Sequence, residues 1–151
     1  MANTFDEIEH LRTRLIDASS GYHEGADLAE RADIVALFIS LRDMHDRHAH
    51  VLSVMLAERG VEDDDDESLL AVVHKSILTV RALVTGLDEN VIHGLIDGEE
   101  RIITLYDRAL DSLVNDAPLR ATLAEQRAEL EHRILEMREG VDTEARRNKL
   151  S

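Results

Sequence analysis

The chain has 151 residues and no cysteine, and its 17 Lys and Arg residues stand against 32 Asp and Glu, for a formal net charge of −15 at pH 7. This length suits one domain with its own hydrophobic core, and the lack of cysteine excludes disulfides, thiolate zinc sites and iron–sulfur clusters. Because such an acidic surface repels nucleic acid and anionic lipid, we expect neither as a partner.

The first predicted helix covers about residues 3–32, with Asn3 or Thr4 as a candidate cap. The N-terminal segment MANTFDEIEHLRTRL is polar and acidic, unlike a signal peptide. The second helix covers about residues 33–59 and ends at Gly60, a typical C-terminal cap. No apolar run reaches the roughly 18 residues of a membrane span, so we expect a cytoplasmic protein that does not enter a membrane.

A long crossover, residues 60–87, separates the second and third helices. It contains the acidic run VEDDDDES and a short predicted helix over about residues 68–85. At roughly 1.5 Å per residue, that short helix is long enough to run along most of a bundle.

The third helix is predicted over about residues 88–114, and the fourth starts at Pro118 after the turn NDAP and ends near Glu139. The polar tail, residues 141–151, is expected to fray. Short links within each helix pair predict two antiparallel hairpins. The expected fold is therefore all-α, a four-helix bundle over residues 1–140 with one long crossover.

The third helix carries a carboxylate in the middle of its apolar face. Glu99 lies at the centre of that face, which consists of Ile92, Leu95, Ile102, Ile103, Tyr106, Leu110 and Leu113. A buried carboxylate without a partner is costly or becomes protonated. Glu99 therefore needs either a metal ion or a hydrogen-bonded group such as His48, Tyr106 or Arg127.

The second helix carries two histidines on or near its apolar stripe, which consists of Ile34, Leu37, Leu41, Met44, Leu52 and Met55. His48 lies at the centre of the stripe, and His45 lies at its shoulder, where it can reach water. The two residues are one turn apart, so both rings can reach one point. Each of the two is either a metal ligand or a core histidine whose ring nitrogens are hydrogen-bonded within the protein. His50 and Asp46 fall on the opposite face and are expected to be solvated.

The segment GEERIITLY resembles the third helix of ferritin-like proteins of the rubrerythrin and bacterioferritin type, in which a ligand Glu precedes a Tyr by seven residues, as Glu99 precedes Tyr106. From about Phe5 to Arg138, the chain also resembles small bacterial ferritin-like proteins of unknown function, through SSGYHEGADLAERA, the RG turn at Gly60 and GEE. The resemblance implies a carboxylate–histidine site for Fe, Mn or Zn inside the bundle and, by analogy, a homodimer.

The sequence departs from a full di-iron site, which would take a Glu from each of two helices and Glu-x-x-His from the other two. The second helix has only His45-Asp46-Arg47-His48, and the fourth has no such motif. Two further carboxylates are candidates. Glu131 lies at the edge of the fourth helix's apolar face, which consists of Leu119, Leu123, Leu130, Ile134 and Met137. Glu24 matches the family pattern but lies about 120° from the apolar stripe of the first helix, which consists of Leu11, Leu15, Ala18, Tyr22, Gly25 and Ala29. An ordinary edge or surface carboxylate is the alternative for both.

These residues support two functions of different classes. The first is a metal-handling or oxidative-stress protein with His45, His48, Glu99, Glu131 and Glu24 as candidate ligands and no assigned catalytic residue. The second is a non-enzymatic scaffold or adaptor that binds no metal and whose buried polar cluster specifies helix register. A third class is the histidine-phosphotransfer module, which needs an exposed histidine. His74 and His93 are the candidates, but neither is followed by the Lys-Gly that is usual in such modules.

Overall fold

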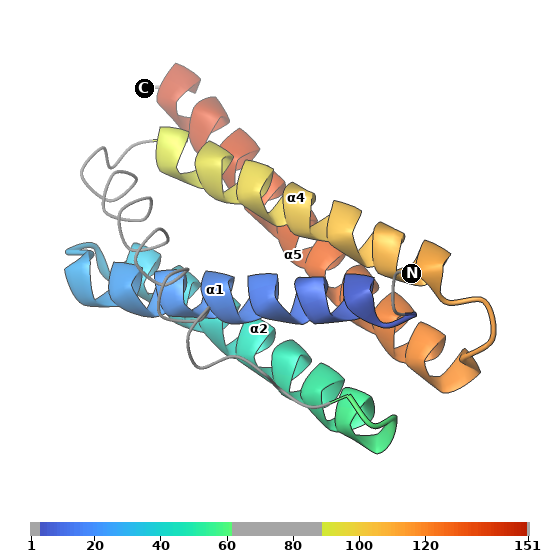
Figure 1. Ribbon diagram of the computed structural model, residues 1–151. Helices are drawn as coiled ribbons and strands as arrows, with labels where there is room; N and C mark the ends of the chain where they lie inside the picture. Colours follow the sequence, from blue (N-terminus) through green and yellow to red (C-terminus); the bar gives the residue numbers. More distant parts are fainter. Residues whose placement is uncertain (1–3, 62–88, 151) are drawn as a thin grey trace. The chain divides into compact units, whose positions relative to one another are not determined.

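The structure is a computed structural model that describes residues 4–61 and 89–150. The described residues form four α-helices and no strand, which confirms the all-α class for this part of the chain (Figure 1). In chain order the helices are α1 (Asp6–Leu28), α2 (Ala32–Glu58), α4 (Glu89–Ser112) and α5 (Ala117–Leu150). The chain divides into two compact units, Met1–Thr85 and Gly86–Ser151.

In the first unit, α1 and α2 form an antiparallel hairpin (Figure 1). Phe5 occupies the capping position of α1 without a side-chain hydrogen bond, so the predicted Thr4 cap is wrong, and Asn3 lies outside the described residues. Acidic residues in the first turn of α1 are favoured by the partial positive charge of a helix N-terminus.

Gly60 ends α2 as the sequence predicts. It has a φ of +78°, and its N–H donates to Ala57 O at 3.0 Å while the N–H of Val61 donates to Leu56 O at 2.9 Å. This pair of bonds is a Schellman motif, in which glycine adopts the left-handed conformation at no steric cost.

The core of the first unit follows most of the predicted stripes. Its buried apolar side chains are Ile8, Leu11, Leu15, Tyr22, Ile34, Phe38, Leu41, Met44, Ala49, Leu52 and Leu56. Leu37 and Met55, predicted to face inward, are only half-buried, whereas Phe38 and Leu56 next to them are buried. The buried face of α2 therefore extends farther around the helix, toward Phe38 and Leu56, than the predicted stripe does, by less than the roughly 100° between successive residues.

In the second unit, α4 and α5 form another antiparallel hairpin (Figure 1). The N–H of Leu119 donates to Asp116 Oδ1 at 3.2 Å, which caps the first turn that contains Pro118. Arg120 donates to the carbonyl oxygens of Leu110 and Leu113, near the C-terminal end of α4.

The predicted stripe of the fourth helix is confirmed, because all of its members are buried: Leu119, Leu123, Leu130, Ile134 and Met137. However, α5 continues to Leu150 instead of ending near Glu139. The segment expected to fray is rich in Ala, Arg, Glu and Lys, which favour helix, and it contains no proline to stop one.

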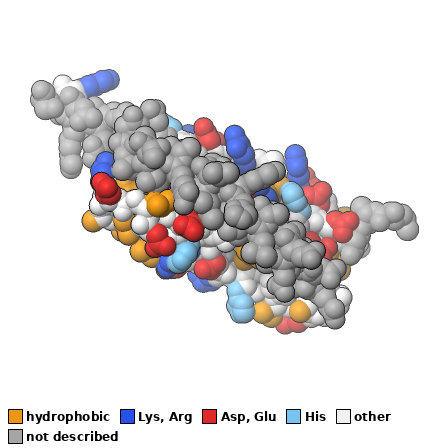
Figure 2. Space-filling model, turned by 60° about the vertical axis from the view of Figure 1, so that its left-hand side comes forward, with side chains coloured by type: hydrophobic (Ala, Val, Ile, Leu, Met, Phe, Trp, Pro, Cys, Tyr) orange, Lys and Arg blue, Asp and Glu red, His pale blue; other side chains and the backbone are white. Residues whose placement is uncertain are grey.

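The predicted crossover helix lies outside the described residues, and the packing of the two hairpins into one bundle stays a prediction. No described helix has a stretch whose length and hydropathy would carry it through a bilayer. On the face drawn in Figure 2, acidic and basic side chains are interspersed.

Candidate functional site

The three residues at the centre of the predicted site are all buried. The exposed fraction is 0% for His45, 2% for His48 and 1% for Glu99. The burial of His48 and Glu99 agrees with their places on the apolar faces. The expectation that His45 reaches water from the shoulder of α2 is wrong, because the inner face of this helix is wider than the predicted stripe.

His45 lies in an aromatic column that joins the two helices of the first unit. The ring of Tyr22 on α1 stacks on His45, with 5.9 Å between ring centroids and an interplanar angle of 6°. The other neighbour of Tyr22 is Phe38, at 5.7 Å and 39°. Phe38 and His45 are seven residues apart on α2, so one aromatic side chain of α1 contacts two positions of the facing helix that lie two turns apart.

In the second unit, the hydroxyl of Tyr106 donates to Gln126 Oε1 at 2.9 Å, and both side chains are buried. Burial, followed by the negative charges of Glu99 and Glu129, raises the pKa of Tyr106 far above its ordinary value. The phenol is therefore neutral at physiological pH, and its proton is engaged with Gln126.

Gln126 is absent from the sequence-based prediction, although its position gives a signal. It lies three residues after Leu123 and four before Leu130, at the heptad spacing of the buried face of α5. Arg12, Asp17 and Ser19 on α1 are further buried polar residues that the prediction missed. Their positions differ from the predicted apolar stripe, so the pattern of α1 alone gave no signal for them.

Glu131 lies on the surface of the second unit. Its side chain is 58% exposed and accepts a hydrogen bond from Arg127 Nη1 at 3.1 Å. Arg127 also donates to Asp107 at 2.6 Å, and this bond is the main cause that raises its pKa. The guanidinium thus pairs with two surface carboxylates, both within its own unit.

The interhelix contacts also give the register of α4 against α5. Tyr106 pairs with Gln126, Asp107 with Arg127, and Glu100 with Arg138. By this register, Glu99 is level with the turn of α5 around Ile134 and Met137, which is apolar on its buried side. Glu131 lies about one turn away from that level and on the exposed face, so it does not lie beside Glu99.

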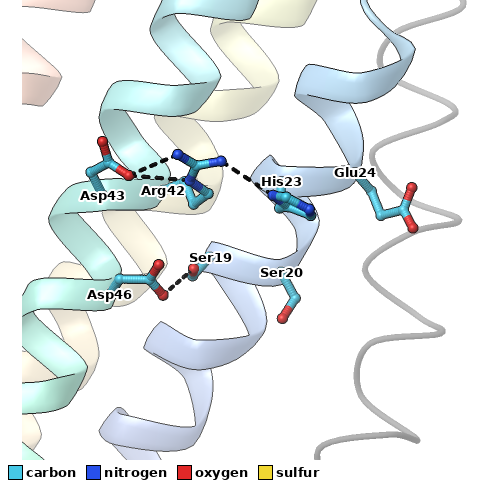
Figure 3. A pocket seen from close by; sticks show the side chains of 7 residues that line it. All are labelled: Ser19, Ser20, His23, Glu24, Arg42, Asp43 and Asp46. Carbon is cyan, nitrogen blue, oxygen red and sulfur yellow. Dashed lines mark hydrogen bonds and ion pairs between the residues drawn. The ribbon is translucent and has the colours of Figure 1, made fainter.

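Glu24 lies at a surface pocket of the first unit with a volume of about 500 Å³. The pocket is lined by Ser19, Ser20, His23, Glu24, Arg42, Asp43 and Asp46 (Figure 3). Ser19 donates to Asp46, so Asp46, expected to be only solvated, links the two helices instead. In Figure 3 the Glu24 carboxylate extends away from the hydrogen-bonded residues.

His23 in this pocket is held by Arg42, whose Nη1 lies 3.2 Å from His23 Nδ1, while Arg42 also donates to Asp43 (Figure 3). A guanidinium has only donors, so Nδ1 must accept and the ring proton is on Nε2. A metal-bound histidine ordinarily donates its second ring N–H to an acceptor. Because Nδ1 of His23 accepts from Arg42 instead of donating, this contact argues against His23 as a metal ligand.

Among the described residues of either unit, no group of three or more His, Asp or Glu side chains is arranged to hold a metal ion. His45 and His48 belong to the first unit and Glu99 to the second, and their common ligand set stays a prediction. His93 is exposed on α4, and His74 lies outside the described residues.

Searches of curated proteins and of solved structures found no match. A family model described as "Domain of unknown function (DUF2383)" matches residues 3–112. The matched range includes Glu24, His45, His48 and Glu99 but leaves out α5 with Glu131. Because the match covers most of the 151 residues, the chain belongs to this DUF2383 family.

Proposed function

We propose that this protein binds one Fe, Mn or Zn ion through His45, His48 and Glu99 and serves in metal handling or oxidative stress. The observation that carries the proposal is the nearly complete burial of all three side chains, on the apolar faces of α2 and α4. Ionisable groups are rarely buried to this extent unless they are paired or coordinate a metal.

The chemistry of the donor set fits one such ion. Two imidazole nitrogens and one carboxylate, without sulfur, suit Fe, Mn or Zn, and this combination leaves coordination positions open for water or a small ligand. A bound ion would supply Lewis acidity or, if iron, redox chemistry with oxygen or peroxide. The exposure of Glu131 and the place of Glu24 at an open pocket favour a mononuclear site over a dinuclear one.

The proposal requires the two hairpins to pack as a ferritin-like four-helix bundle, which we further propose to form a homodimer in the cytoplasm. Support comes from the third-helix segment GEERIITLY and from the hairpin pairs α1–α2 and α4–α5. A pair of amphipathic helices covers only part of the apolar surface of each helix, and a second pair covers the rest.

The second candidate function is a scaffold or adaptor without a metal. The bond between Tyr106 and Gln126 favours it, because it shows that this chain can satisfy a buried polar group with a neutral partner. In such a protein, His45, His48 and Glu99 would share protons and fix the register of the helices.

Elemental analysis of protein purified without a metal-affinity tag separates the two functions. We expect about one Fe, Mn or Zn ion per chain, lost in Glu99→Ala and in His48→Ala. Glu131→Ala, which removes a surface carboxylate, is the matched control and should keep the ion. Metal-free protein whose melting temperature does not change when Fe²⁺, Mn²⁺ or Zn²⁺ is added would support the scaffold instead.

The variant Glu99→Leu, measured in protein freed of metal, distinguishes a carboxylate that is retained for a metal from one that belongs to a buried ion pair. If the carboxylate is retained for a metal, the leucine should leave the metal-free protein as stable as wild type or more so. If Glu99 is instead half of a buried ion pair, the free energy of unfolding should fall by about 3 kcal/mol or more, because the partner charge is stranded. Urea unfolding of both proteins measures the difference.

A further inference from the structure

The imidazole of His45 is held against an aromatic face. The ring planes of His45 and Tyr22 are within 6° of parallel, and their centroids are 5.9 Å apart, as in an offset stack. Tyr22 is itself buried and contacts Phe38 at 5.7 Å. Tyr22 thus packs against two residues of α2 that lie two helical turns apart.

We propose that Tyr22 is a positioning residue that fixes the plane of the His45 imidazole for metal binding. This inference rests on the proposed function, because it concerns one of the three proposed ligands. It adds to the site a residue of α1, a helix from which the sequence predicts only Glu24 as a ligand.

The physical reason is that the imidazole of a histidine side chain rotates easily. Rotation about the bond between Cβ and the imidazole is broad and only weakly restricted by the backbone. The lone pair of the unprotonated ring nitrogen, which binds the metal, lies in the ring plane, so this rotation decides where that nitrogen points. A flat aromatic ring against one face of the imidazole restricts the rotation, and an aliphatic side chain of similar size, which has no flat face, restricts it less.

Phe38 makes the arrangement stiff. It packs against Tyr22 at an interplanar angle of 39°, and its side chain is fully buried. Because Phe38 and His45 are both fixed to α2, Tyr22 cannot slide along the helix without losing one of the two contacts. Hydrogen-bonded groups that orient a metal-bound histidine commonly change metal affinity by about 10–100-fold when they are removed, and we expect a stacked ring that fixes the imidazole plane to act in the same range.

Binding of Co²⁺ to the metal-free full-length protein tests the proposal, since the visible spectrum of Co²⁺ reports its coordination geometry. Tyr22→Leu should weaken Co²⁺ binding by about 10–100-fold and change the spectrum. Tyr22→Phe keeps the flat ring and should restore both to wild-type values. If Tyr22→Leu does not fold, Tyr22→Met replaces it, because a flexible thioether fills the space without a flat face.

Leu56→Ala is the control for simple loosening of the hairpin. It creates a cavity in the same unit, three helical turns from His45, and should lower the stability while leaving the Co²⁺ spectrum unchanged. Wild-type affinity and spectrum in Tyr22→Leu would overturn the positioning role and leave the proposed function intact.

A measurement without metal separates this inference from the proposed function. In the metal-free protein, the ring of Tyr22 should shift the NMR signals of the His45 ring protons, and Tyr22→Phe should preserve that shift while Tyr22→Leu abolishes it. Failure of the wild type to bind Co²⁺ would overturn the metal-binding function. Unchanged His45 signals in Tyr22→Leu would overturn the stacking restraint itself.

Discussion

The α1–α2 hairpin and the α4–α5 hairpin bury polar side chains in different ways. The first hairpin buries ionisable groups, among them His45, His48 and Arg12. The second buries the neutral pair of Tyr106 and Gln126 together with a single carboxylate, Glu99. Among the described residues, both buried histidines thus belong to the first hairpin, which also buries Asp17, and Glu99 belongs to the second.

The hairpins also differ in their polar links. In the first, Ser19 bonds to Asp46 and His23 to Arg42 around an open pocket. In the second, the link between Tyr106 and Gln126 is buried, and the ion pairs between the helices lie on the surface. The polar links described between the helices thus lie around a surface pocket in the first hairpin, and one of them is buried in the second.

The largest expected effect comes from cavities in the two cores. Leu52→Ala in the first hairpin and Leu123→Ala in the second each truncate a fully buried leucine and should cost about 2–5 kcal/mol. If the hairpins fold together as the bundle proposed above, each variant should shift one common transition, measured by urea unfolding followed by circular dichroism. Two transitions, each moved by one variant only, would contradict the bundle.

The second effect is a loss of stability at alkaline pH that originates in the second hairpin. The pKa of folded Tyr106 is raised above its ordinary value of about 10, so the folded state binds the phenolic proton more tightly than the unfolded state. Stability is therefore unaffected by Tyr106 below pH 10 and falls by about 1.4 kcal/mol per pH unit above it.

Urea midpoints measured against pH check this slope, and Tyr106→Phe should remove it. Tyrosinate absorbance gives a second readout, because the chain has two tyrosines and no tryptophan. Ionisation of both tyrosines near pH 10 in the folded protein would show that the phenol of Tyr106 is not protected.

A smaller effect is expected when the neutral pair is broken. Gln126→Leu leaves the Tyr106 hydroxyl buried without its acceptor and should cost about 1–2 kcal/mol. The double variant Tyr106→Phe/Gln126→Leu removes both polar groups and should recover most of the loss, as a double-mutant cycle would show. Additive losses would mean that the two side chains stabilise the hairpin independently.

Periodicity predicted the helices well, because each amphipathic face is a property of one helix. It identified the buried stripe of α5, the cap at Gly60, and the burial of His48 and Glu99. A glycine or proline that ends a helix is also visible in the sequence. The end of α5 was predicted wrongly, because Gly140 directly after Glu139 does not end the helix, which continues to Leu150.

Features that depend on how two helices rotate and align were harder to predict. The burial of His45 follows from Tyr22 on another helix, and the role of Gln126 follows from the position of Tyr106. Neither pairing can be derived from the pattern of one helix, because a rotation of one residue changes which side chains face the partner. The metal site depends on the packing of the two hairpins and stays a prediction for the same reason.

The smallest effect is expected for Gly98→Ala, which tests whether another helix packs closely against α4 next to Glu99. A Cβ added at Gly98 would meet no atom within 4 Å, and alanine is the better helix former, so we expect a gain of about 0.5–1 kcal/mol. Gly60→Ala is the matched control and should lose stability, because its φ of +78° strains any side chain. A loss at position 98, measured by urea unfolding, would mean that another helix approaches α4 closely there, as a tightly packed bundle requires.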